Sequence, residues 1–202
     1  LDIMRKFGVK TLKGYYLKHE HCDKEYQGCR IDEFLVRKQD YVACDYTVEG
    51  DYSSASYLLA LIAINGGKAR IKNLFRDSKQ GDKYILDILQ KMGATVIRGE
   101  DYVEIASEGN LKAIDVDLSN APDLLITVAV LAAMAEGTTN ITGVAHARVK
   151  ETDRIDTTCR ELEKLGCKLT EREDGMSITG GVTSGVVDSH GDHRLAMAFS
   201  LI

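Results

Sequence analysis

The sequence has no tryptophan, a single proline and no cluster of basic residues among its 202 positions. Its formal net charge is −5, and an acidic chain without a basic patch argues against a nucleic-acid-binding protein. The longest apolar run, residues 124–135, reaches only about half of the length that a membrane-spanning helix requires. We therefore expect neither nucleic acid nor membrane as a partner.

Cysteine pairs with the spacing of a zinc or redox motif are also absent. The cysteines are odd in number and form no CxxC motif; they are Cys22, Cys29, Cys44, Cys159 and Cys167. This pattern favours reduced thiols in the cytoplasm over a disulfide framework or a structural zinc site. The chain is 44% hydrophobic and 28% charged, which is typical of a globular protein with a packed core.

Both ends of the sequence fall inside helical patterns. Leu1 belongs to an amphipathic pattern that continues to Phe7, and residues 194–202 form a helical pattern without a C-terminal glycine. We expect the sequence to be a segment of a longer chain.

An internal repeat organises the chain. The triplet Lys-apolar-Gly ends an amphipathic helical pattern three times, at Lys6-Phe7-Gly8, Lys91-Met92-Gly93 and Lys164-Leu165-Gly166. Each glycine is predicted to follow its helix in the left-handed conformation. Strand patterns follow, so the repeat spans about 70 residues, a period typical of repeated supersecondary units.

Each repeat is predicted to run strand–helix–strand–helix–strand–strand, which makes the fold class α/β with repeated βαβαββ units. Two repeats are complete, at residues 46–107 and 113–181, and a third begins near Val186. The first helix of each complete repeat is apolar nearly all round, and we expect it to be buried. The second helix is amphipathic and is expected to expose one face.

The most informative segment is Arg-Val-Lys-Glu-Thr-Asp-Arg at residues 148–154. Arg148, Lys150 and Arg154 could bind phosphate or carboxylate, and Glu151 could move a proton among them. Thr152 is predicted to cap the helix that follows, and a helix start preceded by cations favours anions. The spacing alone leaves open a charged helix entry with local ion pairs.

Four motifs in order, the segment at 148–154 among them, resemble the 5-enolpyruvylshikimate-3-phosphate synthase (3-phosphoshikimate 1-carboxyvinyltransferase) family. The others are Val-Glu-Gly-Asp-Tyr-Ser-Ser-Ala-Ser at 48–56, Asn-Ala-Pro-Asp at 120–123 and Gly-Asp-His-Arg-Leu-Ala-Met at 191–197. The resemblance implies the enolpyruvyl transferase fold, an inside-out α/β barrel of two domains with three repeats each. Residues 1–46 would be the tail of the substrate-binding domain, and residues 47–202 an incomplete second domain.

The resemblance also implies a reaction, transfer of the enolpyruvyl group of phosphoenolpyruvate to the 5-hydroxyl of shikimate 3-phosphate. In that family the residue matching Asp123 binds the 5-hydroxyl and is a candidate base. Glu151 would carry the proton, and Lys150 would assist. Arg154 and Arg194 would hold phosphoenolpyruvate. No metal or organic cofactor is implied, and a monomer is expected.

Two histidines complete the implied site. His193 would belong to the phosphoenolpyruvate pocket. His146 stands where the family often has asparagine, at a position that contacts the shikimate phosphate. His190 lies three residues before His193, which is weak evidence for a metal site, and we expect it at the surface. Without the resemblance, Asp123 could only complement a helix dipole and Arg194 could only pair with Asp192.

Other functions are compatible with parts of the pattern. They are the sister transferase that uses UDP-N-acetylglucosamine, a non-catalytic anion-binding repeat domain, and an RNA-end-processing enzyme of related architecture. The acidic charge and the lack of an ATP-binding signature argue against the last. Since other catalytic residues of the family fall outside these 202 residues, we expect the segment alone to have negligible activity.

Overall fold

The computed structural model describes residues 1–14 and 33–202, which form two compact units, Leu1–Val48 and Glu49–Ile202. The first unit contains a short helix and one antiparallel strand pair: α1 (Asp2–Lys6), β1 (Thr11–Gly14) and β2 (Glu33–Val36). Cys22 and Cys29 lie outside the described residues. Cys44, Cys159 and Cys167 are free thiols.

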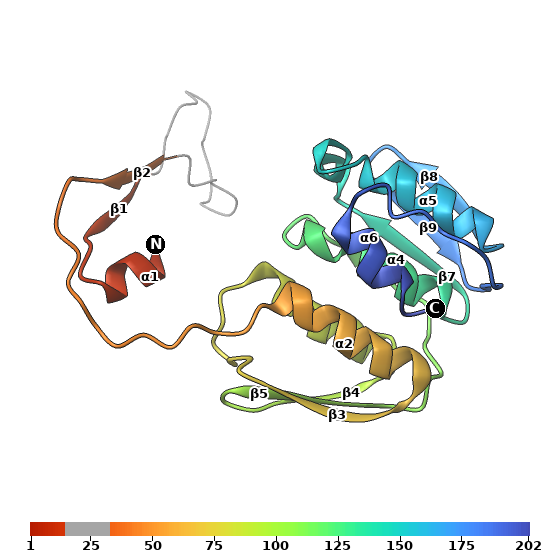
Figure 1. The fold of residues 1–202 in the computed structure, drawn as a ribbon, viewed down its shortest axis with the longest axis horizontal. Helices are drawn as coiled ribbons and strands as arrows, with labels where there is room; N and C mark the ends of the chain where they lie inside the picture. Colours follow the sequence, from red (N-terminus) through yellow and green to blue (C-terminus); the bar gives the residue numbers. More distant parts are fainter. Residues whose placement is uncertain (15–32) are drawn as a thin grey trace, which may run out of the picture. The chain divides into compact units, whose positions relative to one another are not determined.

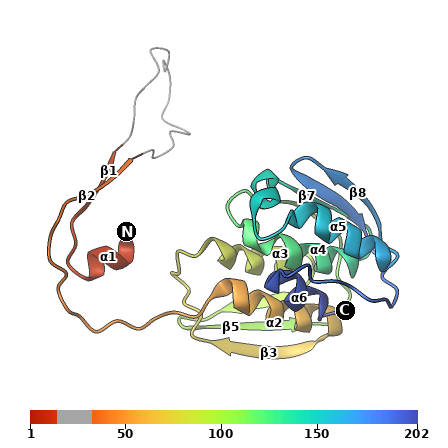
Figure 2. The same cartoon turned by 45° about the horizontal axis from the view of Figure 1, so that its top comes forward.

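The second unit opens with the first repeat (Figures 1 and 2). Its elements are α2 (Tyr52–Asn65), β3 (Gly67–Lys72), η1 (Gly81–Tyr84), α3 (Ile85–Lys91), β4 (Thr95–Arg98) and β5 (Tyr102–Ser107). The strands form an antiparallel sheet in the order β3-β5-β4. Helix α2 packs on β3 and β5.

The second repeat follows the same order with one strand more. Its elements are β6 (Asp115–Asp117), η2 (Pro122–Leu124), α4 (Leu125–Ala133), β7 (Thr138–Thr142), η3 (Ala145–Val149), α5 (Arg154–Lys164), β8 (Lys168–Arg172) and β9 (Gly175–Thr179). The sheet order is β6-β7-β9-β8, and only the β6–β7 pair is parallel. Helix α6 (His193–Phe199) follows the second repeat and packs on α4.

The repeat predicted from the sequence is confirmed in its helix ends. Gly8, Gly93 and Gly166 follow α1, α3 and α5 with φ values of +78°, +108° and +85°. A side chain would be strained in this region, and a glycine there allows the chain to turn from the helix into the next strand.

A strand was predicted at the start of every repeat, and only the second repeat has one. Residues 37–51 and 180–192 contain no strand. Before α2, Gly50 donates its N–H to the carbonyl of Asn73, beyond the end of β3. The chain therefore enters α2 past the end of the sheet instead of alongside it. Residues 115–117 instead have β7 as a parallel neighbour.

Burial of the two apolar helices also differs. Every residue of α4 is buried, as predicted, because α4 contacts α2, α5, α6 and strands of the four-stranded sheet. Helix α2 is not wholly buried: it packs by one side, and Leu58 and Leu61 on the other are 56% and 39% exposed. Helix α5 buries Ile155, Cys159 and Leu162 and exposes Arg160, the amphipathic pattern expected of it. No helix among the residues described could cross a membrane.

Candidate functional site

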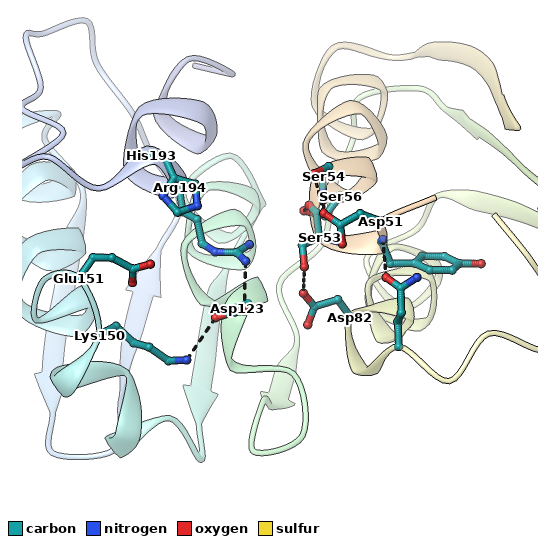
Figure 3. A network of polar contacts seen from close by, with 12 residues as sticks. Asp51, Ser53, Ser54, Ser56, Asp82, Asp123, Lys150, Glu151, His193 and Arg194 are labelled. Atoms are coloured by element: carbon teal, nitrogen blue, oxygen red, sulfur yellow. Dashed lines mark hydrogen bonds and ion pairs between the residues drawn. The ribbon is translucent and has the colours of Figure 1, made fainter. Parts of the chain in front are cut away.

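Three helix starts bring the predicted site residues together, since α4 packs against both α5 and α6. Asp123 lies in η2, which leads into α4. Lys150 and Glu151 lie between η3 and α5, whose first residue is Arg154. His193 and Arg194 open α6. Figure 3 shows Lys150, Glu151, His193 and Arg194 grouped around Asp123.

The carboxylate of Asp123 is the centre of this group. Its Oδ1 lies 3.1 Å from Nη1 of Arg154 and 3.7 Å from Nζ of Lys150, and its Oδ2 lies 3.1 Å from Nη2 of Arg194. Asp123 also lies in the first turn of η2, where a carboxylate complements the helix dipole. The dipole alone does not explain it, because three cations from two other segments converge on it.

Arg154 joins three carboxylates from inside the protein. Its side chain is 1% exposed, and it donates to Asp192, Asp123 and Glu151 over 2.8, 3.1 and 2.7 Å. Burial acts to lower the pKa of the guanidinium, but hydrogen bonds and the charges of these carboxylates, Asp192 first, raise it above its usual value. The group is a fixed cation with a planar fork that suits carboxylate or phosphate.

Asp192 is the site residue that the sequence analysis missed. It is fully buried, accepts Nε of Arg154 at Oδ2, and caps α6 by accepting the N–H of Arg194 at Oδ1 over 2.8 Å. Burial would raise its pKa, but the hydrogen bonds from Arg154 and the Arg194 N–H hold the pKa below the usual value. An aspartate directly before a helical pattern is an N-cap signal that could have identified it.

The alternative interpretation of Arg194 as an ion-pair partner of Asp192 is wrong. The guanidinium of Arg194 reaches Asp123, and only its backbone N–H bonds to Asp192. The buried Asp192 is already taken by Arg154. Arg194 is thus held at its backbone by one acid and at its side chain by another.

The capping prediction at α5 is wrong by one residue. Asp153 is the N-cap, accepting the N–H groups of Ile155 and Asp156 over 3.1 and 3.0 Å. Thr152 lies instead with its hydroxyl 3.4 Å from that of Thr157 and 3.5 Å from Asp192. A carboxylate one residue later provides the stronger acceptor for the free N–H groups of the first turn.

Arg148 differs from the other cations of its motif. Its guanidinium donates to Asp153 and Glu171 and to the carbonyls of Arg172 and Glu173. These bonds engage all three of its nitrogens with the start of α5 and the β8–β9 turn. Arg148 therefore anchors the loop that carries Lys150 and Glu151.

The remaining predicted residues line the accessible side of the group. Lys150, Glu151 and His193 are exposed, and Nδ1 of His193 lies 3.9 Å from Oδ1 of Asp192. His146 is exposed on η3. Lys150, Glu151 and His193 thus combine access for a ligand with at least one contact to the buried acid–arginine cluster.

A second group of polar residues lies at the start of α2 and in η1, on the side that faces this cluster (Figure 3). Asp51 caps α2 by accepting the N–H groups of Ser53 and Ser54. Ser53 donates its hydroxyl to Asp82 in η1. Burial raises the pKa of Asp82, the Ser53 hydrogen bond opposes this, and the charge of Asp123 adds to the rise.

His190 does not lie free at the surface as predicted. Its Nε2 lies 2.7 Å from Oε1 of the buried Glu161 on α5. His193 contacts Asp192, so the two histidines have different partners. Over the described parts of the chain, no three His, Cys, Asp or Glu side chains are grouped as metal ligands would be.

This arrangement can exchange anions. Arg154, Arg194 and Lys150 are neutralised by Asp123 and neighbouring acids, so a bound carboxylate or phosphate can replace Asp123 as their partner. Asp123 would then be released close to the anion, free to accept a proton from a hydroxyl group.

The chain is similar to a known protein family and to named relatives, and the similarity covers most of its length. The family model described as EPSP synthase (3-phosphoshikimate 1-carboxyvinyltransferase) matches residues 32–202. Relatives named 3-phosphoshikimate 1-carboxyvinyltransferase from Methanobrevibacter smithii and Methanothermobacter thermautotrophicus are 73% and 62% identical, over 100% and 84% of this chain. These matches cover 46% and 40% of the relatives, so the chain spans a little under half of their length.

Solved structures agree with the sequence comparison. An EPSP synthase structure from Acinetobacter baumannii is 31% identical, with a TM-score of 0.72, and the match covers 98% of this chain and 46% of that one. The fold is therefore the mixed α/β fold of the enolpyruvyl transferases, as predicted from the sequence. By family model, sequence identity and fold together, the chain belongs to the EPSP synthase family.

Proposed function

We propose that the protein containing this chain transfers the enolpyruvyl group of phosphoenolpyruvate to the 5-hydroxyl of shikimate 3-phosphate. The observation that carries the proposal is the single carboxylate, Asp123, on which Arg154, Arg194 and Lys150 converge. The names of the relatives that match this chain support the choice of substrates.

The reaction requires one proton to leave the 5-hydroxyl, and another to be added to the methylene carbon and later removed from it. The 5-hydroxyl oxygen bonds to C2 of phosphoenolpyruvate while its own proton leaves and another is delivered to the methylene carbon. The C2–O bond to phosphate then breaks, and a proton leaves the methyl group to restore the double bond. Phosphate is the leaving group, and no oxidant or reductant is consumed.

The site residues divide this work between them. Arg154 and Arg194 bind the anionic groups of phosphoenolpyruvate in bidentate fashion, with His193 beside them. Asp123, relieved of its arginine partners, orients the 5-hydroxyl and accepts its proton. Glu151 carries the proton to and from the carbon, and Lys150, whose Nζ lies 3.7 Å from Oδ1 of Asp123, assists the transfers. His146 is assigned to the shikimate phosphate.

The wider setting of the protein follows from the same proposal. Residues 1–46 belong to the substrate-binding domain, and residues 47–202 form part of the second domain. Closure of the two domains excludes water from the site. The protein acts as a cytoplasmic monomer without metal or organic cofactor, and the 202 residues alone have negligible activity.

A segment exchange tests the proposal. The 202 residues replace the matching part of the Methanobrevibacter smithii relative, and phosphate release from phosphoenolpyruvate is measured with shikimate 3-phosphate or UDP-N-acetylglucosamine. We expect release with shikimate 3-phosphate only, and a loss of about 10²–10⁴-fold in Asp123→Ala, the range typical of an acid–base group. Asp156→Asn, which breaks the surface pair with Arg160, is the matched control and should leave the rate unchanged.

Two results would contradict the proposal. Turnover with the sugar nucleotide in place of shikimate 3-phosphate would assign the sister reaction. Silence with both acceptors, in a folded chimera, would leave a non-catalytic anion-binding domain.

A further inference from the structure

The segment that leads into α6 is held against α5 at two points. At one point, Arg154 donates a hydrogen bond to Asp192 inside the site. The other is Glu161, which follows Arg154 by seven residues, or about two helical turns, and so lies on the same face of α5. Glu161 lies outside the proposed reaction, yet its side chain is fully buried.

Both carboxylate oxygens of Glu161 contact the segment before α6. Its Oε2 accepts the N–H of Asp188 over 3.0 Å, and its Oε1 lies 2.7 Å from Nε2 of His190. Lys164, from the exposed side of the same helix, donates to Oε1 over 2.7 Å. A buried carboxylate with three partners is strongly held, and replacing one of its partners leaves a charge poorly compensated.

The segment itself is shaped to meet these contacts. His190 has a φ of +50°, an uncommon conformation for a residue other than glycine, and its N–H bonds to Oδ1 of Asp188 over 2.7 Å. Asp192 donates its N–H to the carbonyl of Ser189 over 2.8 Å. Asp188, His190 and Asp192 are therefore linked in one compact turn, whose last residue caps α6.

We infer that Glu161 and His190 are positioning residues for phosphoenolpyruvate binding: they fix the turn 188–192, and thereby the placement of His193 and Arg194. Arg154 determines where Asp192 lies, and Glu161 determines where the turn before it lies. A turn held at both points presents Arg194 to Asp123 in one geometry. This inference rests on the proposed function for the identity of the ligand.

The charge of Glu161 agrees with this role. Burial acts to raise its pKa, but hydrogen bonds from Lys164, the Asp188 N–H and His190 bring the pKa down to about 2. The carboxylate is thus ionised throughout the neutral range, and the anchor does not depend on small changes of pH.

Two substitutions each weaken the contact between Glu161 and the turn 188–192, one from either side. Glu161→Gln keeps the shape and removes the charge. His190→Asn keeps a residue that tolerates positive φ and removes the ring that reaches Glu161. Glu163→Gln is the matched control, because it makes the same change at an exposed position of the same helix, two residues from Glu161.

Steady-state kinetics of the chimera described above provide the first readout. Because a small displacement of an oriented group weakens its contact with substrate, we expect the KM for phosphoenolpyruvate to rise about tenfold in both variants. The KM for shikimate 3-phosphate and kcat should stay within about threefold, and Glu163→Gln should match the unmodified chimera. An unchanged KM for phosphoenolpyruvate in both variants, or equal rises for the two substrates, would overturn the inference.

Amide hydrogen exchange on the 202-residue chain provides a second readout that needs no activity. The N–H groups of Asp188, His190 and Asp192 should exchange faster in Glu161→Gln than in Glu163→Gln. Equal exchange in the two variants would overturn the inference. An unmodified chimera that releases no phosphate would refute the proposed function instead, and the exchange experiment would still decide whether Glu161 anchors the turn.

Discussion

The two complete repeats share their order of helices and strands but differ in what they carry at the start of the second helix. In the second repeat, η3 and the charged loop lead to α5, which begins with the buried Arg154. The two repeats are offset by the sequence separation between Gly93 and Gly166. With this offset, the position equivalent to Arg154 in the first repeat is Gly81, the first residue of η1. One repeat thus has a cation where the other has no side chain at all. A common scaffold tolerates both, because the apolar faces build it and the helix starts hold the chemistry.

The ion pairs of the two repeats differ in the same way. Arg70 with Glu104 and Arg98 with Asp87 lie on the partly exposed surface of the first repeat. Arg154 is the centre of a buried cluster in the second. Exposed pairs contribute little to stability, whereas removing one member of a buried cluster leaves charges without compensation.

Removal of the buried cation should have the largest effect on stability. Arg154→Met leaves Asp192 buried without its partner, and we expect the free energy of unfolding to fall by about 3–5 kcal/mol. Arg98→Met in the first repeat, the matched control, should cost no more than about 1 kcal/mol. Urea unfolding of the 202-residue chain measures both, and equal losses would contradict the distinction between the two repeats.

The first helices of the two repeats provide the next contrast. Leu131 in α4 is fully buried, and Leu131→Ala should destabilise by about 2–5 kcal/mol through lost contacts and the cavity left behind. Leu58 in α2 is 56% exposed, and Leu58→Ala should change stability by about 0.5 kcal/mol or less. Thermal unfolding of the two variants compares them directly. A large loss from Leu58→Ala would mean that this face of α2 is covered in solution.

The junction between the repeats can be tested at Gly81. A Cβ atom at this position would lie 2.4 Å from the carbonyl oxygen of Asn120, which precedes the Pro122-Asp123 pair. Gly81→Ala must therefore displace the backbone next to the site, and we expect a loss of about 1–3 kcal/mol, as is typical of overpacking. If Gly81→Ala left the stability unchanged, the close approach to Asn120 would have no energetic role.

Much of this architecture could be predicted because it depends on local signals. The glycines at 8, 93 and 166 end helices for a conformational reason that is visible in the sequence. The grouping of Asp123, Lys150, Arg154 and Arg194 came from the resemblance of motifs, and the geometry agrees with it. The pairing of each acid could not be predicted, since Asp192 is 38 residues from Arg154 and 71 residues separate Arg194 from Asp123.

Other predictions failed where packing overrides pattern. The exposure of Leu58 depends on which elements surround α2, and an apolar sequence does not specify its neighbours. His190 was expected at the surface because Glu161, the partner of its ring, lies on a helix 29 residues away in sequence. The strand expected before α2 is absent because a strand needs a neighbour, which residues 115–117 have in β7.

The smallest effect we expect is on the free energy of unfolding at acidic pH. It again distinguishes a buried carboxylate of the second repeat from an exposed one of the first. The pKa of Glu161 falls from an ordinary value of 4.5 to about 2 in the folded chain. The unfolded chain therefore binds more protons between about pH 4.5 and pH 2, and the free energy of unfolding must decrease as the pH falls through this window. Above it, the stabilisation is fully present.

Glu161→Gln removes this ionisation, so the variant should lose less stability between pH 5 and pH 3 than the unmodified chain. Each pKa unit corresponds to about 1.4 kcal/mol, but Lys164, the largest of the three favourable contacts, is half-exposed and screened by solvent, so we expect a difference of about 1 kcal/mol. Asp87→Asn in the first repeat, whose pair with Arg98 is exposed, serves as the control and should leave the profile unaltered. Urea unfolding at the two pH values gives the slopes. Parallel profiles for Glu161→Gln and the unmodified chain would mean that the carboxylate has no special environment in solution, and the anchoring of the 188–192 turn would lose its electrostatic basis.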